Sequence, residues 1–252
     1  MAQQATPERT ARLGRALGSE PATVNGVALL LPNGEESSAR RPSPLSAVSV
    51  RGLGRRLARA GREQQLATHV VHYRYRGWNG HEAHLAHDAA WAADEAVRRY
   101  GDVPVCLVGL GMGGRAALRA AGHEAVNSVV ALAPWLPEED GTAPAEPVRQ
   151  LAGRQVLIVH GTNDARTDPE LSFRLAARAK KANREVCRFE VHADGHGLNQ
   201  YRDEVLALAE DFVMGVLFGR GFSRPVQDAL AAPPPLGLRM PLAAGFGRSL
   251  RR

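Results

Sequence analysis

Cysteine and aromatic residues are scarce in this sequence. Its 252 residues include two cysteines, Cys106 and Cys187, and only 5% are aromatic. Both cysteines fall in apolar segments that resemble buried strands, which favours two reduced core thiols over a disulfide. Because 44% of the residues are hydrophobic, the chain can still bury a sizeable core, and one α/β domain is the simplest division.

Long hydrophobic runs are also missing. No stretch approaches the roughly 20 consecutive apolar residues that cross a membrane as a helix. The N-terminal residues MAQQATPERTARLGRALG lack the apolar core of a signal peptide. We therefore expect no membrane association and a cytoplasmic location.

Lysine is nearly absent, although the chain is basic. Lys180 and Lys181 are the only lysines among 32 basic residues, and the net charge is +6. The arginines are scattered through every segment and form no stripe along the sequence, whereas a nucleic-acid interface is typically patchy. An arginine-rich composition explains this pattern better than a binding face, so we expect no nucleic-acid partner.

Short apolar segments alternate with helical ones through most of the chain. Strands are predicted at residues 27–31, 68–73, 105–108, 128–132, 155–160 and 187–191, and helices at 46–60, 85–100, 115–121, 169–181 and 201–218. This alternation predicts an α/β fold with a predominantly parallel sheet and helices on both faces.

Two flanking segments do not share this alternation. Residues 1–20 are polar, with a weak helix predicted around residues 8–17. Residues 219–252 form a tail rich in proline, glycine and arginine, which we expect to be peripheral or disordered. The predicted domain therefore covers residues 21–218.

A glycine-dense turn at residues 109–114 follows the strand at 105–108, and two motifs fit it. Gly109, Gly111 and Gly114 satisfy G-x-G-x-x-G, the dinucleotide-binding pattern. That pattern also requires an acidic residue at the end of the next strand, and residues 131–135 contain none. The alternative is the nucleophile elbow G-x-S-x-G, matched at Gly109 and Gly113 but with Gly111 where serine belongs. The context favours the elbow, so no cofactor is expected.

Two further residues follow later strands of the predicted sheet. Asp164 lies just after the strand at 155–160, and His196 lies in a Gly-His-Gly turn after the strand at 187–191. The carboxyl ends of parallel strands share one edge of a sheet, where sites form. We therefore expect Asp164 and His196 to face each other, although each could also be an ordinary turn residue.

With this elbow, acid and histidine in order, residues 27–218 resemble the α/β-hydrolase fold family. The resemblance implies that Asp164 is the acid, that His196 is the base and that the Met112 N–H belongs to the oxyanion hole. It implies a second oxyanion donor at about Asn33 or Gly34. The short connection at residues 133–150 implies that there is no sizeable lid domain.

The resemblance fails at the nucleophile, because Gly111 has no side chain. Three functions remain open: a non-hydrolysing binder of a small molecule, an enzyme that uses His196 and Asp164 as a general base, and a scaffold protein. For the first two, Leu110, Trp78 and Trp135 are predicted to line the pocket, although either tryptophan could instead cap the core.

Two other features have simpler interpretations. His81, His84 and His87 recur near a helix start, but the ligand set is incomplete, so a solvated helix face is favoured and no metal is expected. Asp168 precedes Pro169, which predicts that it starts a helix.

Without a nucleophile at Gly111, the purified protein should give no burst of acyl-enzyme with an activated ester. It should also resist labelling by serine-directed phosphonates, as measured by intact-protein mass spectrometry. Stoichiometric labelling of a loop serine, for example Ser37 or Ser46, would reveal a different nucleophile.

Overall fold

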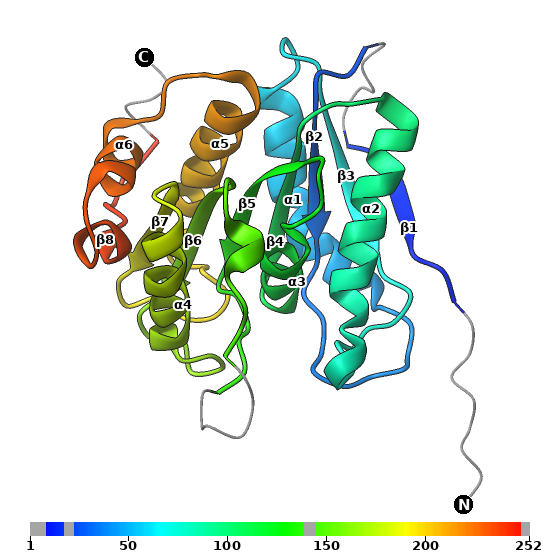
Figure 1. Cartoon of the computed structure of the whole chain (residues 1–252), viewed down its shortest axis with the longest axis horizontal. Helices are drawn as coiled ribbons and strands as arrows, with labels where there is room; N and C mark the ends of the chain where they lie inside the picture. The colour runs from blue at the N-terminus through cyan, green and yellow to red at the C-terminus, as the bar shows by residue number, and fades with distance from the viewer. Residues whose placement is uncertain (1–8, 18–22, 139–144, 248–252) are drawn as a thin grey trace, which may run out of the picture.

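The computed structural model describes residues 9–17, 23–138 and 145–247, and one eight-stranded sheet runs through them (Figure 1). The strand order is β1-β3-β2-β4-β5-β6-β7-β8; β1 is antiparallel to β3 and the other pairs are parallel. The strands are β1 (Arg12–Ala16), β2 (Gly26–Leu31), β3 (Leu66–His72), β4 (Val105–Leu110), β5 (Val126–Leu132), β6 (Gln155–Gly161), β7 (Val186–Val191) and β8 (Met240–Pro241).

Helices cover both faces of this sheet. They are α1 (Pro44–Ala60), α2 (His84–Tyr100), α3 (Met112–Ala120), α4 (Pro169–Ala182), α5 (Arg202–Phe218) and α6 (Arg224–Ala231), with 3₁₀ turns η1 (Gly80–Glu82), η2 (Arg149–Leu151) and η3 (Leu236–Leu238). One core joins the sheet to α2, α3 and α4, and a second joins it to α1, α5 and α6. The predicted α/β class, with a parallel sheet and two helical layers, is confirmed.

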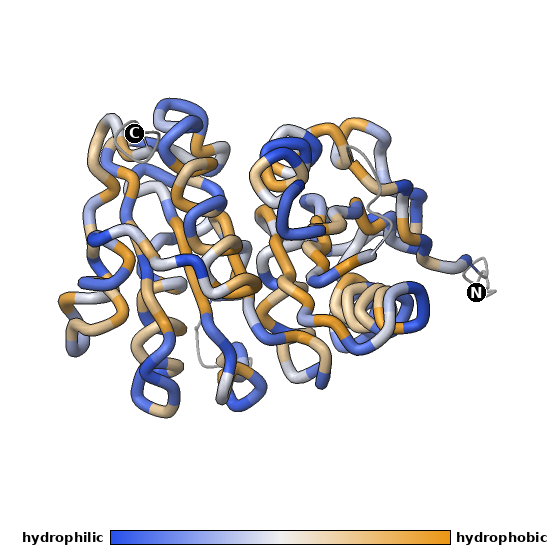
Figure 2. The backbone as a smooth tube through the Cα atoms, turned by 90° about the horizontal axis from the view of Figure 1, so that it is seen from above, coloured by the Kyte–Doolittle hydropathy of each residue, from blue (hydrophilic) through white to orange (hydrophobic). Residues whose placement is uncertain are grey.

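The central strands are short apolar runs because both of their faces are covered. All six residues of β2 (GVALLL) are buried, and β4 is buried along its first five residues. In Figure 2 hydrophobic segments run through the interior, whereas the peripheral loops are largely hydrophilic. This placement is expected for parallel strands between helical layers.

Predicted local features also agree with the structure. Asp168 starts α4, and its side chain accepts a hydrogen bond from Glu170 N at 2.9 Å. Cys106 and Cys187 are free, buried thiols, and burial raises the pKa of each to about 12. None of the described helices is both long and apolar enough to span a bilayer. The described part of the β5–β6 connection contains only the 3₁₀ turn η2 and no lid domain.

The weak helix predicted around residues 8–17 is wrong, because Arg12–Ala16 is strand β1 at the edge of the sheet. Leu13 pairs with Val71 of β3 and is buried. Without β1, β3 would be the edge strand and would leave backbone donors and acceptors unpaired. That partner is remote in sequence, so local propensity does not reveal the pairing.

The segment 219–252 is not a loose tail over its described part. It forms α6, η3 and β8, and it buries Val226 and Leu238 completely. Lys180 Nζ donates to Ala229 O at 2.9 Å, and Arg188 Nη1 donates to Leu238 O at 2.9 Å. These hydrogen bonds attach the segment to α4 and β7. The compact domain therefore extends beyond residue 218.

Leu238 and Leu236 lie in the same 3₁₀ turn but are 0% and 66% exposed, respectively, which gives a matched test of this docking. Leu238→Ala should lower the free energy of unfolding by about 2–5 kcal/mol, because it empties a buried site. Leu236→Ala should change it by less than about 0.5 kcal/mol. Equal effects in urea denaturation would contradict the docking.

Candidate active site

The glycine-dense turn joins β4 to α3 at the carboxyl edge of the sheet. Gly111 stands at the N-cap of α3 with φ 56° and ψ −120°, a backbone conformation that strains residues with side chains. A Cβ at Gly113 would lie 2.1 Å from Leu31 O, so the turn packs directly against the end of β2. The sequence therefore places glycine where the backbones meet and where φ is positive.

Asn33, in the loop after β2, fills the space beside this turn. Its Oδ1 accepts hydrogen bonds from Met112 N at 2.8 Å and from Gly34 N at 2.9 Å. A Cβ built on Gly111 would lie 2.3 Å from that oxygen. The Asn33 amide therefore occupies space that any side chain at position 111 would need.

The N–H groups of Met112 and Gly34 thus converge on one point, and both were predicted as oxyanion donors. Asn33, the alternative predicted donor, instead contributes an acceptor through its side chain. Asparagine commonly bonds to nearby backbone in turns, so its position after Pro32 and before Gly34 was the available signal.

Asp164 and His196 meet at the neighbouring strand ends. His196 Nδ1 lies 2.8 Å from Asp164 Oδ2, and the other carboxylate oxygen accepts from the backbone N–H groups of Arg166 and Thr167. The Asp164 side chain is 0% exposed and that of His196 is 16% exposed. His196 Nε2 has no hydrogen-bond partner among the residues that the structure describes. This ring nitrogen is available to a ligand or substrate.

His160 is a further member of the cluster that sequence reasoning missed. Its Nε2 lies 3.1 Å from Asp164 Oδ2, the same oxygen that contacts His196. Its Nδ1 lies 2.9 Å from Ser172 Oγ, and that oxygen accepts a hydrogen bond from Arg188 Nε at 3.0 Å. The signal was present in the sequence HGTND, where His160 ends its strand four residues before Asp164.

Burial and hydrogen bonding oppose each other in this cluster. Burial alone would raise the pKa of Asp164, but hydrogen bonds from His160, Arg166 N and His196 hold that pKa well below its usual range. Burial lowers the pKa of His160, and the nearby charge of Arg188 adds to this effect, although Asp164 opposes it. At neutral pH the site therefore contains an ionised Asp164 and a neutral His160.

Trp78 and Trp135, two predicted pocket residues, both stack on Arg115. The guanidinium carbon lies 4.0 Å from the Trp78 ring centre and 5.3 Å from that of Trp135. Arg115 also pairs with the buried Glu146 at 2.9 Å. Trp78 is buried in the core, and Leu110 is partly buried against the opposite core. The tryptophans thus bury a paired cation, and their predicted role in ligand binding stays a prediction.

The three histidines near the start of α2 do not converge. His84 contacts Asn79 Nδ2 at 3.2 Å and packs edge-on against Tyr75, whereas His81 contacts Glu82. Across the described ranges, no cluster of three histidine, cysteine or acidic side chains has a geometry that could hold a metal ion.

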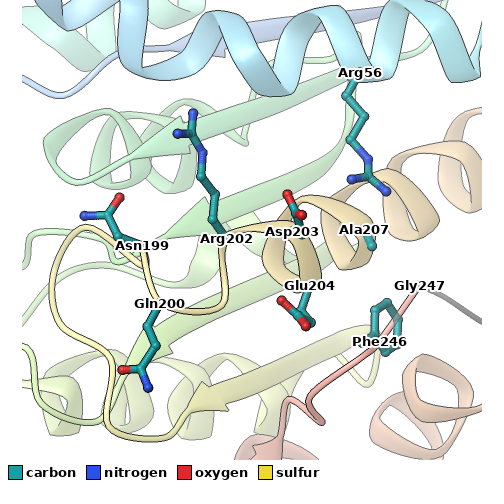
Figure 3. A pocket seen from close by; sticks show the side chains of 9 residues that line it. All are labelled: Arg56, Asn199, Gln200, Arg202, Asp203, Glu204, Ala207, Phe246 and Gly247. Atoms are coloured by element: carbon teal, nitrogen blue, oxygen red, sulfur yellow. The ribbon is translucent and has the colours of Figure 1, made fainter.

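A cavity of about 630 Å³ lies between α1, the start of α5 and the segment at Phe246 and Gly247 (Figure 3). Asn199 and Gln200, which line it, belong to the loop that follows His196. Its charged lining residues are two arginines and two acids: Arg56, Arg202, Asp203 and Glu204. Gly111 is not among its lining residues, so this cavity is separate from the glycine turn.

Comparisons with known proteins identify the fold. The sequence matches no protein-family model and none of the curated proteins with which it was compared. An α/β serine hydrolase without a lid from Xanthomonas campestris is 16% identical, with a TM-score of 0.59 over 84% of this chain and 90% of that one. A thermophilic esterase from Thermogutta terrifontis, solved with butyrate, is 19% identical, with a TM-score of 0.59 over 84% and 91%. These likenesses establish an α/β-hydrolase fold for this chain.

His160 gives a prediction about pH. Because burial lowers its pKa in the folded state, the unfolded chain binds the proton first once the pH falls below about 6.5. The wild type should therefore lose stability between pH 7.5 and 5.5, by at most about 1.4 kcal/mol per pH unit from this group. His160→Gln keeps a donor for Asp164 and should flatten the slope, measured by denaturation across pH.

His87→Gln, at an exposed histidine, is the matched control and should leave the slope unchanged. Parallel pH profiles for the wild type and His160→Gln would contradict the assignment.

Proposed function

We propose that this chain is a non-hydrolysing protein on an α/β-hydrolase scaffold, in which Gly111 stands at the nucleophile position, and that it binds a small molecule at the carboxyl edge of the sheet. The observation that carries the proposal is the hydrogen bonding of Asn33 Oδ1 to the N–H groups of Met112 and Gly34. The fold shared with esterases and serine hydrolases supports the assignment of the turn.

Serine hydrolysis needs a nucleophile and an empty oxyanion hole. Donors in such a hole lie about 2.7–3.1 Å from the oxyanion. Asn33 Oδ1 lies 2.8 Å and 2.9 Å from its two donors, so the chain's own amide satisfies groups that would otherwise stabilise a tetrahedral intermediate. Gly111 can form no acyl-enzyme. Both requirements are therefore unmet in this chain.

The other half of the site supports binding. Asp164 holds His196 by its Nδ1 and leaves Nε2 without a partner among the described residues, while most of the ring is buried. A half-enclosed imidazole of fixed orientation can hydrogen-bond one polar group of a small molecule. Ligand sites typically combine a few fixed polar groups of this kind with apolar walls.

The same geometry supports a second function. Because Asp164 orients His196, its Nε2 could take a proton from water or from an acidic substrate, without a covalent intermediate. A positioned general base contributes about 10²–10⁴-fold to a rate. His196→Ala separates the two functions: it abolishes turnover by a general base, whereas in a binder it weakens only ligand affinity.

The proposal predicts how esterase activity would return. Gly111→Ser supplies the hydroxyl but places its Cβ where Asn33 Oδ1 now lies, so the single variant should have little activity. Gly111→Ser combined with Asn33→Ala supplies the hydroxyl and frees the two N–H groups. We expect the double variant to hydrolyse an activated p-nitrophenyl ester about tenfold or more faster than either single variant, with an acyl-enzyme burst.

Adding His196→Ala to the double variant is the control and should remove the gain. A burst in the wild type would overturn the proposal. If the double variant folds but gains no esterase activity, then features other than the missing nucleophile and Asn33 also distinguish this site from that of a hydrolase. Gly111→Ser alone should also lower the free energy of unfolding by about 1–3 kcal/mol, since serine is strained at positive φ.

A further inference from the structure

A second cavity, distinct from the glycine turn, is lined by arginines. It has a volume of about 480 Å³, and its charged lining residues are Arg9, Arg12, Arg41 and Arg74, beside His72 and Tyr73. Among the described residues that line it, none is acidic. The cavity shown in Figure 3 is lined by two arginines and two acids, so the single sign of its charged lining residues distinguishes the present cavity from that one.

Three remote segments build this arginine pocket. Arg12 begins β1 and Arg9 precedes that strand, Arg41 lies in the loop before α1, and His72 ends β3, with Arg74 just after it. The antiparallel register sets Arg12 directly opposite His72, so both side chains leave the sheet on the same face. Tyr73 Oη donates to Pro32 O at 3.1 Å, which connects the pocket to the loop that carries Asn33.

Two of the four arginines are anchored by the protein. Arg74 Nε pairs with Asp88, whose side chain is fully buried, and Arg9 Nη1 donates to Ala39 O at 2.8 Å. Within the described ranges, the guanidinium groups of Arg12 and Arg41 have neither a hydrogen-bond nor an ion-pair partner. The pocket thus contains two guanidinium groups, those of Arg12 and Arg41, that have no partner among the described residues, beside those of Arg9 and Arg74, which the protein holds in place.

The positive charge around the pocket affects the protonation of His72. His72 has a lowered pKa because it is partly buried and because the charges of Arg12 and Arg51 disfavour a further proton. Like charges brought together from separate segments repel one another, and a bound anion would relieve that repulsion. Guanidinium groups also match phosphate and carboxylate oxygens with two parallel hydrogen bonds.

We propose that the arginine pocket binds a small polyanion, a molecule with several phosphate or carboxylate groups. A volume of about 480 Å³ suits a small molecule. The concave site favours this class over nucleic acid, which typically contacts an extended basic surface. The inference stands on the pocket's own residues and holds whether or not the protein hydrolyses esters.

Isothermal titration calorimetry with pyrophosphate and with citrate tests the proposal and separates the two sources of negative charge. At least one of them should bind the wild type with one-to-one stoichiometry. Arg12→Gln combined with Arg41→Gln should weaken that binding about tenfold or more, because charge-assisted hydrogen bonds are lost. Neither side chain has a hydrogen-bond or ion-pair partner among the described residues, so the variant should fold, as its melting temperature would verify.

Arg62→Gln combined with Arg224→Gln removes the same charge from exposed positions outside the pocket and should change the affinity less than about twofold. Equal losses in the two double variants would overturn the proposal in favour of general electrostatic attraction. Absence of binding by both probes would also overturn it. Tighter binding of a single-stranded RNA, lost in the pocket variant alone, would assign the surface to nucleic acid instead.

Discussion

The contact between Asn33 and the N-terminus of α3 organises the carboxyl edge of this fold. The first N–H groups of a helix have no partner within the helix, and Gly111, at the N-cap, has no side chain to satisfy them. Asn33 Oδ1 reaches across from the loop after β2 and accepts from Met112 N. One side chain thus caps α3 and joins two neighbouring connections of the sheet. It can do so only because position 111 is glycine.

Asp164 is a second centre of hydrogen bonding, and these bonds give its carboxylate a structural role. A buried carboxylate is costly unless its oxygens are hydrogen-bonded. Four donors surround Asp164: two backbone N–H groups, His160 and His196. His160 in turn joins Asp164 to Ser172 of α4 and through it to Arg188 of β7. Removing the Asp164 carboxylate would leave donors unpaired on several elements, so this cluster helps to hold those elements together.

The alternation of apolar and helical segments along the sequence predicted most strands of the sheet. It also predicted that Asp164 and His196 lie close together, because the carboxyl ends of parallel strands share one edge of the sheet. It failed where a partner remote in sequence decides the outcome. Strand β1 needs the open edge of β3, and Leu238 needs the docked segment that Lys180 and Arg188 hold. The arginine pocket joins residues 9–12, 41 and 72–74, so a search for a basic stripe along the sequence could not find it. The role of Asn33 depends on empty space at Gly111, which a sequence does not display.

Gly111 and Asn33 are energetically coupled, because the Asn33 amide lies where a side chain at position 111 would need space. With glycine at position 111, the Asn33 side chain has room to accept hydrogen bonds from Met112 N and Gly34 N. With any other residue at position 111, its Cβ would lie 2.3 Å from Asn33 Oδ1, so the two side chains would overlap. Neighbouring substitutions of this kind are not additive. While Asn33 holds this position, serine at position 111 would cost both backbone strain and two hydrogen bonds, whereas glycine costs neither. The fold therefore opposes any single substitution that adds a side chain at position 111 while Asn33 keeps its two hydrogen bonds.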